Sequence, residues 1–193
     1  ASYTGTTAER NTSVGYQALY SNTGNQSTAV GYQAGRDVTT GLYGTYIGYL
    51  AGTNVTTGSY NVALGRSALV TNTTGSSNTA IGNEALNANT TASYNAALGY
   101  QALYDNTTGG QNTAVGYQAL ANNTTAANNA ALGNGALQLN TTGTSNTATG
   151  RQALYANTTG SYNTAVGQNA LYSNTTASNN TAVGYKALFD NTT

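Results

Sequence analysis

The side chains that could act as acids, bases or metal ligands are few in this chain, and they lie far apart. Histidine and cysteine are absent, which removes the usual ligands of transition metals and any thiol nucleophile. The carboxylates are Glu9, Asp37, Glu84, Asp105 and Asp190. No two of them are spaced for general acid–base chemistry, and no glycine-rich loop opens a long helix that would cradle a phosphate. We therefore expect neither enzyme activity nor a cofactor.

The charge pattern argues against two further classes of partner. Charged residues make up 5% of the 193 residues and the formal net charge is zero, whereas an average soluble domain is roughly 25% charged. A neutral chain has no electrostatic footprint for nucleic acid or for an anionic lipid surface. No apolar run approaches the roughly 20 residues of a membrane-spanning helix. We expect no nucleic-acid partner and no membrane insertion.

Asparagine provides the commonest candidate for modification. Asn-x-Ser/Thr sequons recur along the chain, and such sequons on turns of a secreted protein are acceptors of glycans. The alternative is that Asn-Thr-Thr is simply the turn of the repeat, and this interpretation is favoured because it explains the recurrence without a glycan. The candidate glycosylation sites are Asn72, Asn89, Asn106, Asn140, Asn157 and Asn174.

Threonine and tyrosine provide two candidate binding surfaces. Threonine pairs such as Thr107 and Thr108 would stack into a hydroxyl array similar to the ice-binding faces of antifreeze proteins, although adjacent residues of a strand face opposite ways. Tyrosines that follow a glycine, such as Tyr100 and Tyr117, could stack on sugar rings of surface glycans. The favoured alternative is that they cover a thin core or a subunit interface. A glycan-binding or ice-binding module is therefore the alternative function.

The elements that position these side chains follow from one internal repeat. Glycines after a small apolar pair are 16 residues apart at the first step and 17 at the other nine, and fixed-period self-similarity indicates a solenoid. The array covers residues 1–193 as a single unit. Because it begins and stops in mid-repeat without a cap, we expect a segment of a longer fibre. The aligned glycines are Gly15, Gly31, Gly48, Gly65, Gly82, Gly99, Gly116, Gly133, Gly150, Gly167 and Gly184.

Each repeat reads as one coil of a β-solenoid. The segment "TAVG" favours a strand of three or four residues, "YQAL" favours a bend or a single helical turn, and "NTTGS" is turn chemistry. Seventeen residues are too few for a pair of helices. The sequence therefore predicts an all-β or β-rich parallel β-solenoid (a β-roll) of about eleven 17-residue coils, with room for one helical turn in each coil.

The predicted core of each coil is thin. Every coil offers one Val-type residue, one Leu and two Ala, so we expect apolar surface to be shared between chains, most simply in a homotrimer. A broad single-chain coil with ordered Asn and Thr inside is the alternative, and such coils would polymerise end to end. The predicted core ladder includes Val115, Ala119, Leu120, Val166, Ala170 and Leu171.

One zone departs from the repeat between Arg36 and Asn54. Leucine is replaced there by Gly35 and Gly52, and asparagine is replaced by Gly44. We interpret these changes as drift between copies rather than as a bulge or a docking point.

The repeat resembles two families of fibrous proteins. The core "NTAVG" is similar to the head repeats of YadA-type trimeric autotransporter adhesins, and "NTAVGYQALYxNTTG" resembles repeats of phage-type tail-fibre proteins. The 17-residue period and Thr113 and Thr164, which stand where the adhesin motif has valine, depart from the adhesin pattern. The resemblance implies a trimeric, secreted β-roll, and we expect an extracellular structural fibre or adhesin shaft that is cell-surface or virion-attached.

Overall fold

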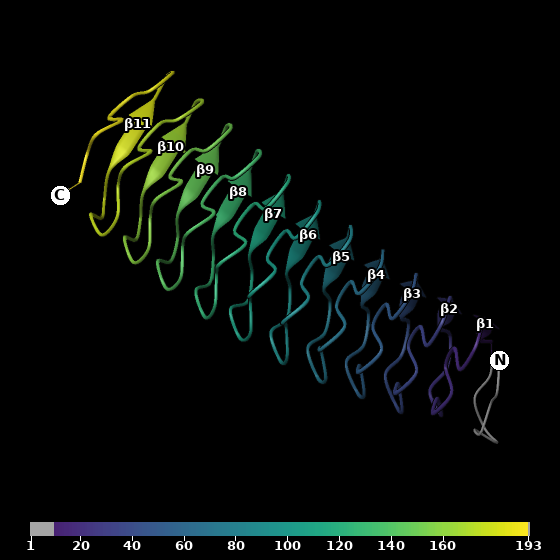
Figure 1. Ribbon diagram of the computed structural model, residues 1–193. Coiled ribbons are helices and arrows are strands. Elements are labelled where there is room, and N and C mark those ends of the chain that lie inside the picture. The colour runs from purple at the N-terminus through teal and green to yellow at the C-terminus, as the bar shows by residue number, and fades with distance from the viewer. Residues whose placement is uncertain (1–9, 193) are drawn as a thin grey trace.

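The chain folds into a straight rod of stacked coils. The computed structural model describes residues 10–192, and within them eleven strands form one parallel sheet whose spatial order is the order along the chain. Figure 1 shows the coils following one another along the rod, with β1 and β11 at opposite ends. This is the predicted parallel β-solenoid, with one coil per repeat.

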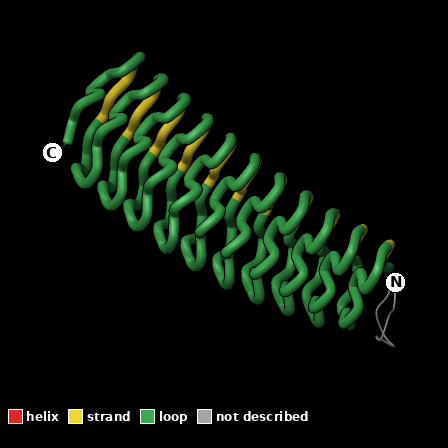
Figure 2. Tube along the Cα trace, in the orientation of Figure 1, coloured by secondary structure: helices red, strands yellow, loops and turns green. Residues whose placement is uncertain are grey.

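The strands are short and in strict register. Each has three residues, as the "TAVG" segment predicted, and each pairs with the equivalent residues of the next coil, for example Ala114 with Ala131. All of them lie along one side of the rod, and the remainder of each coil is loop and turn (Figure 2). The strands are β1 (Thr12–Val14), β2 (Thr28–Val30), β3 (Thr45–Ile47), β4 (Val62–Leu64), β5 (Thr79–Ile81), β6 (Ala96–Leu98), β7 (Thr113–Val115), β8 (Ala130–Leu132), β9 (Thr147–Thr149), β10 (Thr164–Val166) and β11 (Thr181–Val183).

Small apolar side chains fill the interior in stacked columns. The middle residue of β2 to β11 is buried, and it is alanine in every one of these strands except β3. A second alanine and a leucine, three and four residues after the aligned glycine, complete the apolar part of most coils. Four residues of the predicted core ladder are fully buried in these columns, namely Ala119, Leu120, Ala170 and Leu171.

The other two residues of the predicted core ladder lie outside the core. Val115 is only partly buried, and the Val166 side chain is 37% exposed. Successive side chains of a strand point to opposite faces. Because the middle residues Ala114 and Ala165 point inward, the valines that follow them must point outward. The prediction that Val115 and Val166 are core residues was therefore wrong.

The segment after each glycine consists of hydrogen-bonded turns and not of a helical turn, and the described residues contain no helix. Gln118 and Leu120 have φ of +51° and +52°, a left-handed conformation that costs roughly 1–2 kcal/mol for a residue other than glycine. Their amides bond to neighbouring coils, from Gln118 N to the Tyr100 oxygen at 2.9 Å and from Leu120 N to the Ala136 oxygen at 3.0 Å. The hydrogen bonds between coils therefore offset the backbone strain.

The irregular zone has a structural cause, so its interpretation as drift was wrong. Tyr46 replaces the inward alanine of β3, and its ring is 1% exposed. A Cβ atom added at Gly35, Gly44 or Gly52 would lie 2.8, 2.4 or 2.2 Å from that ring. The three glycines thus leave the space that one tyrosine fills.

Restoring the consensus leucine at position 52 alone is expected to destabilise the rod. The Gly52→Leu side chain would overlap the Tyr46 ring, and such overpacking costs about 3 kcal/mol or more. Adding Tyr46→Ala should recover most of this loss, because most coils carry alanine and leucine at these two positions. Urea denaturation of the single and double variants measures both steps. A double variant no more stable than Gly52→Leu would contradict the proposed compensation.

Candidate functional surface

The asparagines of the Asn-Thr-Thr turns lie inside the rod. The Asn123 Nδ2 donates to Oδ1 of Asn106 in the preceding coil at 2.9 Å and to the Ala126 oxygen at 3.0 Å. The same pattern repeats in successive coils, and we call this column the first asparagine ladder. Its members, all with no exposed surface, are Asn72, Asn89, Asn106, Asn123, Asn140, Asn157 and Asn174.

A second asparagine ladder runs beside the strands. The Asn112 Oδ1 accepts the backbone N–H of Asn129 at 3.0 Å, and the Asn112 Nδ2 donates to the Ala126 oxygen at 2.9 Å. Each member thereby satisfies backbone groups of the next coil, which buried peptide groups require. The members are Asn61, Asn78, Asn95, Asn112, Asn129, Asn146 and Asn163, each at most 2% exposed.

This placement argues against glycans on the candidate sequons. All six candidate asparagines belong to the first asparagine ladder. A glycan attaches to Nδ2, and that atom is buried and donates to a carbonyl oxygen three residues later in each case, for example from Asn106 to Gly109 at 2.9 Å. The folded coil has no room for a sugar there. The geometry favours the interpretation of Asn-Thr-Thr as the turn of the repeat.

The threonine pairs are divided between two environments. The first threonine of a pair donates its hydroxyl to the next coil, for example from Thr107 Oγ1 to the Thr124 oxygen at 3.0 Å. The second, such as Thr108, is exposed. In most pairs one threonine therefore presents its hydroxyl to solvent, which leaves a single row instead of a flat array, although Thr175 and Thr176 are both exposed.

Many of the tyrosines stack on one another along the rod. The rings of Tyr100 and Tyr117 are 5.2 Å apart at an interplanar angle of 11°, and those of Tyr43 and Tyr60 are 4.9 Å apart at 12°. Each of these contacts covers one face of each ring, and the four tyrosines are 42–60% exposed. Stacking on sugar rings needs a free face, and the pairing leaves each ring at most one.

The outward face of the sheet carries most of the exposed large aliphatic side chains. Two columns form it: the last-residue column, which is the final residue of every strand, and the first-residue column, which is the initial residue of every strand. Every member of both columns is partly or fully exposed. The leucines protrude furthest among the inner coils, with Leu64, Leu98 and Leu132 being 42%, 46% and 52% exposed.

Sequence reasoning missed this surface because it placed the Val-type residue inside. The signal that could have found it is the alternation of "TAV" itself. A three-residue strand with alanine in the middle turns both flanking residues to one face. The larger side chains, Thr and Val, then lie on the face with more room.

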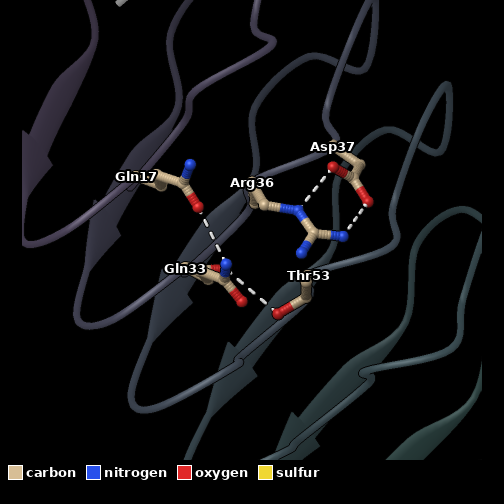
Figure 3. Close-up of polar contacts among 5 residues, drawn as sticks. All are labelled: Gln17, Gln33, Arg36, Asp37 and Thr53. Carbon is tan, nitrogen blue, oxygen red and sulfur yellow. Dashed lines mark hydrogen bonds and ion pairs between the residues drawn. The ribbon is translucent and has the colours of Figure 1, made fainter. Parts of the chain in front are cut away.

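The few charges form local pairs without a converging site. Arg36 donates to Asp37 through Nε at 2.7 Å and Nη2 at 2.5 Å, beside Gln33, whose Nε2 donates to Gln17 Oε1 at 2.8 Å (Figure 3). In the same view Thr53 donates its hydroxyl to the Gln33 carbonyl oxygen at 3.0 Å. The contacts of Gln33 with Gln17 and Thr53 link successive coils, whereas Arg36 and Asp37 pair within one coil.

The carboxylates stay separate in the structure. Glu84 accepts from Gln101 at 2.9 Å and from Arg66 at 2.6 Å, and these two contacts lower the pKa of its carboxyl. Burial raises the pKa of Asp105. Glu9 lies outside the described residues. Within residues 10–192, no three potential metal-ligating side chains cluster.

Comparisons with known proteins add no relatives. No family model, curated protein or solved structure matched the chain. Across residues 10–192, no helix is long and apolar enough to cross a membrane.

Proposed function

We propose that this chain forms part of the shaft of an extracellular fibre in which copies lie side by side, most simply as a homotrimer, joined through the outward face of the sheet. The observation that carries the proposal is the last-residue column, which is aliphatic in all strands except β9. A continuous apolar stripe along a rod marks an association surface. The extracellular setting rests on the resemblance of the repeats to adhesin heads and tail fibres.

The size of this face supports lateral association. Parallel strands about 4.8 Å apart make the sheet ~48 Å long, and its two outward columns lie ~7 Å apart. With side-chain width the strip is ~14 Å across, or roughly 700 Å² per chain, which is comparable to the ~800 Å² that each partner buries in a stable interface. The shaft would hold identical surface groups at regular intervals, so that weak contacts add by avidity.

The mass of the particle in solution tests the proposal. Light scattering on the purified chain should give the mass of three chains. The Leu98→Asp variant should release single chains, because it places a charge in the centre of the apolar strip. A matched control, Thr108→Asp, changes an exposed turn residue and should leave the assembly intact. A wild-type chain that stays monomeric at high concentration, or single rods that join only end to end, would overturn lateral association.

A further inference from the structure

The two outward columns of the sheet vary together. Where the strand ends in leucine, its first residue is Val62, Ala96 or Ala130. In the other eight strands the first residue is always threonine, and the last is valine, isoleucine or, in β9, threonine. An apolar first residue therefore accompanies every leucine, and in two of the three strands that residue is alanine. From β4 to β9 the two kinds of strand alternate.

The fold of a single chain gives no evident reason for this relation. Both residues of a strand point outward, and they are about 7 Å apart. The inward residue between them is alanine in both kinds of strand, as at Ala97 and Ala114. The interior therefore does not distinguish the two kinds of strand.

We infer that the first-residue column of one chain packs against the last-residue column of a second copy at the same coil height, so that each leucine faces the Val62, Ala96 or Ala130 position of its neighbour. This inference rests on the lateral association proposed above and specifies its register. A threefold axis that runs along the rod produces this arrangement. It keeps equivalent coils at one height and places the last-residue column of each sheet beside the first-residue column of the next.

Volume matching supports this register over the alternatives. At equal height Leu98 faces Ala96 of the neighbour and Val115 faces Thr113, so a large residue meets a small one and two medium residues meet. A shift of one coil would put Leu98 against Thr79 or Thr113 and Val115 against Ala96 or Ala130, leaving crowded contacts beside empty ones. An axis perpendicular to the rod and along the strands would instead oppose leucine with leucine. Interfaces pack as densely as protein interiors, so the first arrangement is preferred.

Exchanging the two outward residues of β6 is the decisive experiment. Leu98→Ala leaves a gap facing Ala96, and Ala96→Leu places two leucines against each other, so each single variant should weaken association by about tenfold or more. The double variant, Ala96→Leu with Leu98→Ala, again pairs large with small and should associate within about threefold of the wild type. Sedimentation gives the dissociation constants, and circular dichroism checks the fold. A double variant as weak as the product of the two single effects would overturn the inference.

Disulfide trapping gives an independent measure of the register, because the chain has no cysteine of its own. Chains carrying only Leu98→Cys and chains carrying only Ala96→Cys, distinguished by tags, are coexpressed and mildly oxidised. The mixed 98–96 dimer should dominate over the mixed dimers formed with Thr79→Cys or Thr113→Cys chains. Dominant one-coil-shifted products, or dominant 98–98 products, would overturn the register while leaving lateral association in place. If the wild type is monomeric and nothing is trapped, lateral association itself fails.

Discussion

Replacing Gly116 with alanine is expected to destabilise this rod severely. The added Cβ atom would lie 2.5 Å from the oxygen and 2.7 Å from the carbon of Gly133 in the next coil. Both are backbone atoms, so the coils themselves would have to separate. The φ of Gly116 is +136°, which side chains rarely adopt. Clash and backbone strain together should lower the free energy of unfolding by about 4 kcal/mol or more.

A matched control separates the clash from a general loss of glycine flexibility. Gly135 also has a positive φ, of +64°, but a Cβ atom there would first meet the flexible end of Gln138, at 3.1 Å. Glutamine already occupies the equivalent position in the neighbouring coils as Gln118 and Gln152. Gly135→Gln should therefore change the stability by about 1 kcal/mol or less. Urea denaturation of the two variants makes the comparison, and equal losses would contradict close contact of the glycine column as the cause.

Most of the fold could be predicted from the repeat period alone. A constant spacing of 17 residues puts equivalent residues on top of one another, so the parallel pairing, the strand positions and the buried Ala119 and Leu120 all follow from alignment of the copies. The left-handed backbone after each glycine did not follow from the period. Leucine has no local preference for φ near +50°, and only the hydrogen bonds between coils, which are tertiary contacts, stabilise that conformation at Leu120.

Two other features depend on contacts that one repeat does not contain. The exchange of alanine for Tyr46 and of leucine for Gly35 and Gly52 makes sense only when it is known that these side chains meet inside the rod. The alternation of "TAV" places Val115 on the face opposite to Ala114, but coils with so little charge carry no polar signal that shows directly which face is inside. For the same reason, the sequence could not show whether the candidate asparagines are exposed glycosylation sites or buried turn residues. Asparagine is a polar residue at the surface of most proteins, but here it lines the interior.

Replacing one asparagine of the first ladder with valine is expected to lower the free energy of unfolding by about 2 kcal/mol. Asn123→Val removes the donor to Asn106 Oδ1, and a buried acceptor left without its partner costs about 1–3 kcal/mol. The Ala126 oxygen keeps its bond from Asn112 Nδ2, and Asn140 Nδ2 keeps its bond to the Gly143 oxygen. The neighbouring change Asn122→Ala, at a half-buried side chain, should cost about 0.5 kcal/mol and serves as the control.

Replacing two asparagines that are neighbours in the ladder should lower the free energy of unfolding by less than the sum of the two single replacements. The chain already contains such a pair: Val38 and Val55 occupy consecutive positions of the same column and are fully buried. In the Asn123→Val, Asn140→Val double variant the bond between the two side chains is lost once, although each single variant loses it separately. The double variant should therefore be about 1–2 kcal/mol more stable than the sum of the single losses predicts. Urea denaturation of the full cycle measures this coupling, and strict additivity would show that the asparagines act as independent turn residues and not as a connected ladder.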